Sequence, residues 1–154
     1  MANIGRVRRW DVFWADLQPS VGSEQGGERR PVLVISNDAF NAAMPTVTVL
    51  PLTTLEGKRR KPYAFEVLLP PGTVGKRVTS IVMPHQIRTI SKLRLIEIMG
   101  RVEHGSLREE IEEQLAGQLA AVKKKSDDAA AAARFKAAWA APEASRPRAA
   151  VFSA

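Results

Sequence analysis

The segment Gly22-Ser-Glu-Gln-Gly-Gly-Glu-Arg-Arg-Pro-Val-Leu-Val-Ile35 joins a polar, glycine-rich loop to an apolar run typical of a buried β-strand. The β-branched and aliphatic residues after Pro31 favour the strand conformation. Pro31 also fixes the entry into the strand and restricts Arg30 to an extended backbone. The sequence therefore predicts a buried strand preceded by a loop that exposes a set of polar side chains: Ser23, Glu24, Gln25, Arg29 and Arg30.

Further short runs rich in Val, Ile, Leu, Thr and aromatic residues flank this segment, with turn residues between them. Short β-like runs at close spacing indicate a small, mostly antiparallel sheet or barrel. The expected strands span residues 11–17, 32–37, 46–54, 63–69, 79–83 and 95–102.

Two helices are expected beside this sheet. Residues 38–43 favour a short helical turn with Asp38 as its cap. A longer helix is predicted from Ser106 to about Lys125, because Ser106 and Glu109 have the spacing of a capping box. Its apolar stripe predicts a packing surface for the barrel or a second subunit, and consists of Leu107, Ile111, Leu115, Leu119 and Val122.

The composition changes at the end of the chain. Residues 126–154 contain thirteen alanines and few large apolar side chains. Such a segment buries too little apolar surface to offset its ordering entropy. We therefore expect a barrel domain at 1–125 and a basic, partly helical or disordered tail at 126–154. The alternative is that the tail binds RNA or a partner protein through Phe135 and Trp139.

The composition limits which covalent links and metal sites the chain can form. The 154 residues include no cysteine and two histidines, which excludes disulfides and thiolate metal sites. The beginning of the chain lacks the apolar core of a secretory signal, and no run is long enough to span a bilayer, so we expect a cytoplasmic protein.

The net charge of +7 is unevenly distributed. Residues 123–154 hold seven Lys/Arg against three Asp/Glu, which accounts for +4 of it. A second basic cluster, Lys58-Arg59-Arg60-Lys61, falls in an expected loop. The cluster could contact phosphates without reading bases, or it could simply be a solvated loop.

Five ordered motifs together resemble the MazF/PemK family of toxin endoribonucleases. The motifs are Trp10-Asp-Val-Phe-Trp-Ala-Asp-Leu, Gly22-Ser-Glu-Gln-Gly-Gly, Arg30-Pro-Val-Leu-Val-Ile-Ser-Asn-Asp, Pro51-Leu-Thr-Thr and Gln86-Ile-Arg-Thr-Ile. The resemblance implies an SH3-like barrel with added helices, a homodimer, metal-independent cleavage of single-stranded mRNA without a cofactor, and inhibition by a cognate antitoxin. Trp10 departs from the pattern, since the family usually has glycine there.

The resemblance also implies roles for single residues. Arg30 matches the principal catalytic group and Thr53 the catalytic threonine, although one extra loop residue leaves Arg29 as an alternative to Arg30. An arginine suits a phosphate that gains negative charge, because its planar guanidinium donates two hydrogen bonds and stays charged. The guanidinium keeps its proton at neutral pH and therefore cannot serve as a base. Glu24 or His85 must instead accept the proton of the ribose 2′-OH that attacks the phosphate.

The remaining candidates are RNA contacts. Arg88 has the alternative of an ion pair with Glu24, and Asp16 is expected to organise the glycine loop. The contacts are Ser23, Gln25, Arg29, Gln86, Arg88, Lys58, Arg59 and Arg60. Two other functions stay open: a toxin of the same fold that acts on a protein target, as gyrase poisons do, and an RNA-binding barrel without catalysis.

Overall fold

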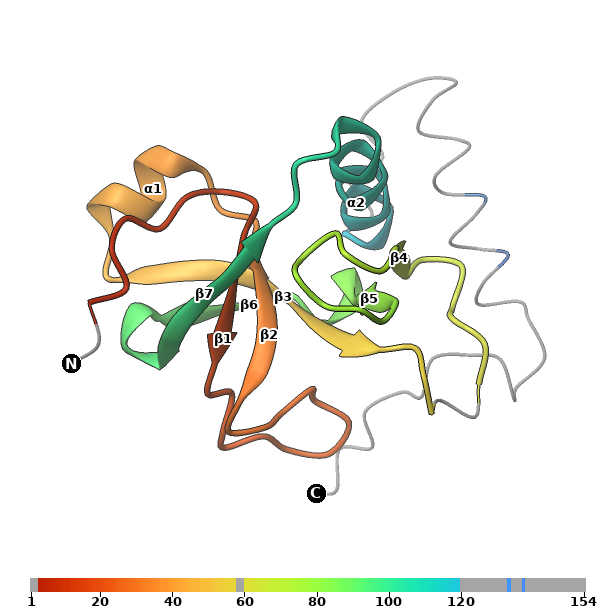
Figure 1. Ribbon diagram of the computed structural model, residues 1–154, viewed down its shortest axis with the longest axis horizontal. Helices are drawn as coiled ribbons and strands as arrows, with labels where there is room; N and C mark the ends of the chain where they lie inside the picture. Colours follow the sequence, from red (N-terminus) through yellow and green to blue (C-terminus); the bar gives the residue numbers. More distant parts are fainter. Residues whose placement is uncertain (1–2, 58–59, 120–132, 134–136, 138–154) are drawn as a thin grey trace.

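The computed structural model describes residues 3–57, 60–119, 133 and 137, and shows a β-rich domain with one longer helix (Figure 1). The strands are β1 (Asp11–Ala15), β2 (Arg30–Val34), β3 (Thr46–Thr54), β4 (Val67–Leu69), β5 (Ser80–Val82), β6 (Arg88–Ser91) and β7 (Leu95–Arg101). The helices are α1 (Asp38–Ala43) and α2 (Gly105–Gln118), with two 3-10 turns, η1 (Pro84–Gln86) and η2 (Lys92–Arg94).

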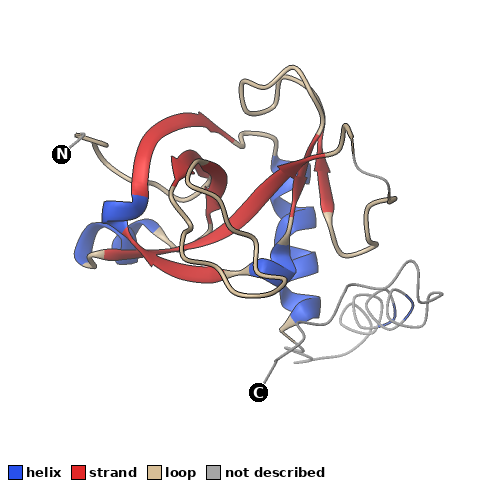
Figure 2. Cartoon of the chain, turned by 90° about the horizontal axis from the view of Figure 1, so that it is seen from below, coloured by secondary structure: helices blue, strands red, loops and turns tan. Residues whose placement is uncertain are grey.

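All strand pairs are antiparallel, and β3 organises the sheet. The strand order is β4-β5-β3-β2-β1-β7, and β6 pairs with the first half of β3 while β5 pairs with its end. Within the described residues, β7 pairs with neither β4 nor β6, so the sheet does not close. The predicted small antiparallel sheet is confirmed, in a form that curls without becoming a complete barrel (Figure 2).

The sheet separates two apolar cores because strand side chains alternate between its faces. We call the cluster around Phe13, Val32 and Val49 the inner core. The cluster around Leu33 and Leu52 is the outer core, which β4, β5 and α2 cover. Successive residues of β2 thus serve both cores, which explains why this strand reads as an unbroken apolar run.

Helix α2 lies on the outer core through the predicted stripe. Ile111 is fully buried, and Leu107 and Leu115 pack beside it. Leu119 is 57% exposed, and Val122 lies outside the described residues. The stripe is therefore a packing surface for the first three of its positions.

Both predicted helix caps are wrong. Helix α2 begins at Gly105, and His104 is its N-cap without a side-chain hydrogen bond. Ser106 consequently lies inside the first turn, where its hydroxyl cannot cap the helix. Helix α1 is capped by Asn37, whose side chain accepts from the Phe40 N–H at 2.8 Å. The carboxylate of Asp38 instead accepts from the backbone N–H of Arg9 at 2.7 Å.

The predicted strand at 63–69 forms only as β4, because its first half makes a turn in which the Glu66 N–H donates to the Tyr63 carbonyl at 3.0 Å. Strand β6 lies outside the six strand ranges expected from the sequence. The tail predicted at 126–154 lies outside the described residues except for Ala133 and Ala137. Within the described part of the chain, no helix has the length and apolar composition needed to cross a membrane.

Candidate active site

The glycine-rich loop between β1 and β2 is held closed by hydrogen bonds at both ends. The Leu17 N–H donates to the Gly27 carbonyl at 2.8 Å. The Asp16 carboxylate accepts from the Gln18 N–H at 2.9 Å, as expected for a residue that organises this loop. A Cβ atom added at Gly26 would lie 2.2 Å from the Ser20 hydroxyl oxygen and 2.7 Å from the Ser20 Cβ, so Ser20 would have to shift to admit any other residue.

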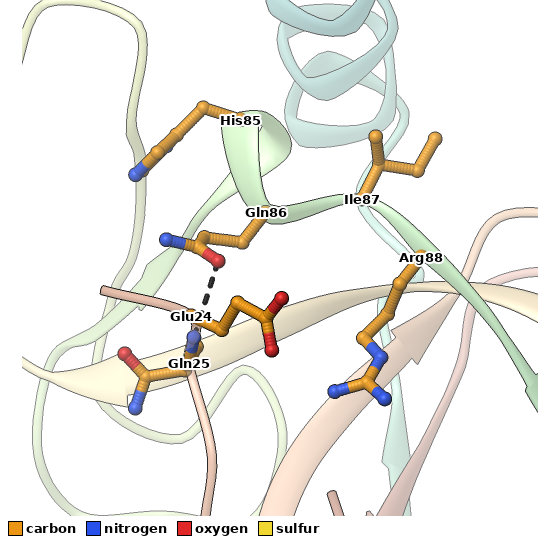
Figure 3. A pocket seen from close by; sticks show the side chains of 6 residues that line it. All are labelled: Glu24, Gln25, His85, Gln86, Ile87 and Arg88. Carbon is orange, nitrogen blue, oxygen red and sulfur yellow. Dashed lines mark hydrogen bonds between the residues drawn. The ribbon is translucent and has the colours of Figure 1, made fainter. Parts of the chain in front are cut away.

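Gln86 fastens the middle of the loop to η1. Its side-chain oxygen accepts from the Gln25 N–H at 3.1 Å (Figure 3), and its amide nitrogen donates to the Ser23 carbonyl at 3.1 Å. One side chain thus satisfies backbone groups on both sides of Glu24. The loop is therefore positioned by a residue more than sixty positions further along the chain.

Arg30, the first residue of β2, points back into this loop. Its Nε donates to the Gly26 carbonyl at 3.0 Å. With the Gln25 amide turned so that its oxygen faces the guanidinium, that oxygen accepts from the Arg30 nitrogens at 3.0 to 3.3 Å. Gly27 has φ +133°, a conformation that L side chains rarely adopt, and allows the loop to pass close to this side chain.

The charge of Arg30 is not balanced by an acidic group. Among the described residues, no carboxylate lies within ion-pair distance of its guanidinium. Burial lowers the pKa of Arg30 from its ordinary value, because the charged form loses solvation. Arginine nevertheless stays protonated in proteins. A half-buried cation held only by neutral oxygens is a good site for an anion such as a phosphate.

Arg29 occupies a different environment from Arg30. It is exposed, forms an ion pair with Glu97 on β7, and its guanidinium lies 4.8 Å from the centroid of the Trp14 ring. The structure therefore directs Arg30, and not Arg29, into the loop.

Thr53 lies at the end of β3 and is 7% exposed. The last paired residues of β2 and β3 are Val32 and Pro51. Beyond Pro51, β3 pairs with β5 instead, with Thr53 opposite Ile81. Arg30 and Thr53, the two predicted catalytic residues, therefore each lie two residues beyond the same end of the β2–β3 ladder.

A pocket with a volume of about 230 Å³ opens next to this end of the sheet (Figure 3). It is lined by Glu24, Gln25, His85, Gln86, Ile87 and Arg88. Gln25 belongs both to this pocket and to the surroundings of Arg30, so the two are adjacent. Four predicted RNA or proton-transfer residues besides Gln25 meet here, although they come from two segments of the chain.

Glu24 and Arg88 face the same space in the pocket without forming the ion pair that the sequence left open. The Glu24 carboxylate accepts from the Val21 N–H at 2.9 Å. The Arg88 guanidinium donates weakly to the Leu17 carbonyl at 3.4 Å. Both groups therefore keep hydrogen-bonding capacity for a ligand.

His85 lies on η1, and neighbouring aromatic side chains cover much of its ring. Its imidazole packs edge-on against Phe65 and Tyr63, with ring centroids 5.0 and 6.4 Å away. Within the described structure, its buried Nδ1 atom has no hydrogen-bond partner. Burial lowers the pKa of His85 below its ordinary value of 6.5, so the ring is neutral at pH 7.

The basic cluster at residues 58–61 is partly neutralised. Arg60 donates two hydrogen bonds to the buried Glu66 carboxylate, at 2.8 and 3.0 Å, and its guanidinium lies 3.8 Å from the centroid of the Tyr63 ring. The hydrogen bond to Glu66 raises the pKa of Arg60. Lys58 and Arg59 lie outside the described residues. Sequence reasoning missed Glu66, because no motif marks a buried acid in a loop.

The fold and this loop–strand site define a class of small toxins. Residues 8–119 match the family of PemK-like, MazF-like toxins of type II toxin–antitoxin systems, and the chain belongs to this family. It is 45% identical over 91 residues to Endoribonuclease EndoA of Bacillus subtilis (strain 168), a match that covers 59% of this chain and 76% of that relative.

Solved structures agree with this assignment. The structure of MazF from Deinococcus radiodurans superimposes with a TM-score of 0.64 at 28% identity, covering 75% of this chain and 98% of that one. A mycobacterial endoribonuclease in complex with its cognate antitoxin has a TM-score of 0.57 at 24% identity, covering 75% and 95% of the two chains. The latter shows that the fold is shared.

Proposed function

We propose that this chain is the toxin of a toxin–antitoxin pair and an endoribonuclease that cleaves single-stranded mRNA at short sequences. The observation that carries the proposal is the half-buried Arg30 guanidinium, which has only neutral oxygen partners among the described residues. Membership of the toxin family and similarity to an endoribonuclease support the reaction.

The reaction needs only the substrate's own nucleophile. The 2′-OH attacks the adjacent phosphorus, the bond to the 5′-oxygen breaks, and the products carry a 2′,3′-cyclic phosphate and a 5′-OH. Arg30 donates to the non-bridging oxygens as their negative charge grows, and the Thr53 hydroxyl adds a further donor. The chemistry proceeds without a metal ion.

A base must take the 2′ proton and an acid must protonate the leaving oxygen. Glu24 and His85 are the candidates, since both line the pocket beside Arg30. The lowered pKa of His85 keeps its imidazole neutral and able to accept a proton at pH 7. Ser23, Gln25, Gln86 and Arg88 contact or orient the RNA, with Gln86 acting mainly by holding the loop.

The partners follow from the same family. A cognate antitoxin would cover the RNA site, and an acidic segment suits the positive charge there. We also propose a homodimer and a cytoplasmic location, where mRNA is available. Sedimentation at micromolar concentration tests the dimer, because a single species near 16.9 kDa contradicts it.

Incubation of the purified protein with a mixed-sequence RNA in EDTA tests the activity. We expect defined fragments that end in 2′,3′-cyclic phosphate. Retention of intact RNA would favour the non-catalytic RNA-binding barrel, and neither cutting nor retention would favour a toxin with a protein target. Sequencing the 5′ ends of the fragments then gives the recognised sequence.

A further inference from the structure

A cluster of two cations around Trp14 lies beside Arg30. Trp14 is a partly buried residue of β1, and two cations approach its ring. The Arg29 guanidinium carbon lies 4.8 Å from the ring centroid and the Lys76 ammonium nitrogen 5.0 Å from it. Strand β1, the glycine loop and the loop after β4 therefore meet at one aromatic ring.

This cluster adjoins Arg30 through the sheet. In the β1–β2 ladder, Ala15 is paired with Arg30 and Trp14 with Pro31, so the Trp14 ring lies one position from the partner of Arg30. Alternation of side chains places Trp14 on the outer-core face and Arg30 on the inner-core face. Lys76 connects the two, because it contacts the Trp14 ring and lies close enough to Arg30 for that charge to act on it.

The two cations of this cluster differ in whether a carboxylate pairs with them. Arg29 is paired with Glu97. Within the described part of the chain, no carboxylate is within ion-pair distance of Lys76. Burial, and then the charge of Arg30, lower the pKa of the Lys76 ammonium. An anion between Lys76 and Arg30 would relieve the repulsion between these two cations.

We infer that Trp14, Arg29 and Lys76 form a second nucleotide subsite, in which Lys76 binds the phosphate next to the scissile one and Trp14 stacks on that nucleotide's base. Aromatic stacking and backbone cations are the two elements of single-strand binding. The pocket shares Gln25 with the surroundings of Arg30, so the pocket and the subsite together would extend the RNA site to both of these neighbours of Arg30. The inference rests on the proposed ribonuclease function and adds residues to its substrate site.

The test uses RNAs of increasing length around a cut site located by fragment sequencing. Binding is measured on copies with a 2′-deoxyribose at the attacking position, which prevents cleavage, and cutting is measured on the all-ribose copies. We expect the wild type to prefer RNAs long enough to reach the subsite, with quenching of tryptophan fluorescence as they bind. In Trp14→Leu the quenching disappears and the preference for longer RNA shrinks roughly tenfold.

Lys76→Gln supplies a variant that leaves the apolar packing of Trp14 intact. It should weaken binding of the longer RNA and reduce the slope of log affinity against log salt by about 0.7, the value for one single-strand phosphate contact. Arg6→Gln is the matched control, because it removes one charge from an exposed position outside the cluster and should keep the wild-type slope.

The two failures differ. A wild type that neither cuts nor binds RNA overturns the proposed function and the subsite with it. A wild type that cuts RNA, while Trp14→Leu and Lys76→Gln keep its length preference and salt slope, overturns the subsite alone.

Discussion

The Nε of Arg30 donates to the backbone carbonyl of Gly26, four residues earlier, at 3.0 Å. The loop that leads into β2 thus folds back to hold the first side chain of that strand. The side-chain oxygen of Gln25, with its amide turned toward Arg30, also accepts hydrogen bonds from the guanidinium. A guanidinium that is already fixed before the substrate binds does not have to reorient when negative charge develops on the phosphate. Such preorganisation is the basis of electrostatic catalysis.

Replacing Arg30 by alanine should therefore reduce RNA cleavage by at least about 100-fold while the fold persists, the scale of losing one preorganised donor. Cleavage is measured on a defined RNA, and folding by circular dichroism. Arg29→Ala is the comparison, and its loss should be smaller than that of Arg30→Ala, because Arg29 pairs with Glu97 and belongs to the proposed second subsite. A larger loss in Arg29→Ala than in Arg30→Ala would reverse the assignment of the two arginines.

Thr53→Val removes one hydroxyl donor while nearly preserving side-chain volume. The loss of one hydrogen bond of about 1.4 kcal/mol predicts a roughly tenfold lower kcat. Thr48→Val is a suitable control, since the Thr48 hydroxyl is exposed and bonds Thr89 at 2.9 Å. Equal activities of the two variants would remove Thr53 from the reaction.

The pH dependence of cleavage separates the two candidate bases. If His85 takes the 2′ proton, the rate falls as pH decreases through its lowered pKa, so the acidic limb lies below 6.5. This limb should vanish in His85→Gln. A profile that His85→Gln leaves unchanged, and that Glu24→Gln alters, would assign the proton transfer to Glu24.

His85 also predicts how stability depends on pH. Its pKa is lower in the folded protein than the ordinary 6.5, so the unfolded chain binds the additional proton first as pH falls. The free energy of unfolding should therefore decrease below about pH 6.5, above the range where ordinary carboxylates titrate. Urea unfolding between pH 7.5 and 5.5 measures the decrease. His85→Phe, which keeps a ring against Phe65, should flatten it, and an equally steep decrease would contradict the burial of a neutral imidazole.

The ion pair between Arg60 and Glu66 should matter for folding. The Glu66 side chain is 0% exposed and accepts from the Arg60 guanidinium and from the Tyr63 N–H. Glu66→Gln should lower the free energy of unfolding by roughly 2 to 3 kcal/mol, because it leaves a partly buried guanidinium without its counter-charge. Glu97→Gln breaks an exposed pair and should cost less than about 1 kcal/mol. Similar losses from both would show that burial of the pair is unimportant.

Local patterns along the chain were enough to predict the β-rich class, most strands and the mouth of β2. The Pro31–Ile35 run predicts β2 because proline and β-branched residues restrict their own backbone. The stripe at Leu107, Ile111 and Leu115 likewise predicts a helix that packs on the sheet. Its helical spacing can be read from the sequence, because periodicity is a local property. The cap of α1 was placed wrongly because Asn37 and Asp38 are adjacent and both can cap the helix. The cap of α2 was placed wrongly because the helix begins already at Gly105, after His104, whose side chain makes no cap hydrogen bond.

The order of the motifs and the position of Arg30 directly before Pro31 are local properties, so they predict the candidate site residues without knowledge of the fold. Tertiary structure alone decided which of them meet. Gln25 and Gln86 are 61 residues apart, and neither the bond between them nor the approach of Lys76 to Trp14 leaves a local signature. The physical reason is that a hydrogen bond or a ring contact depends on distance in space, which is set only when burial of the two cores fixes how the strands and loops pack.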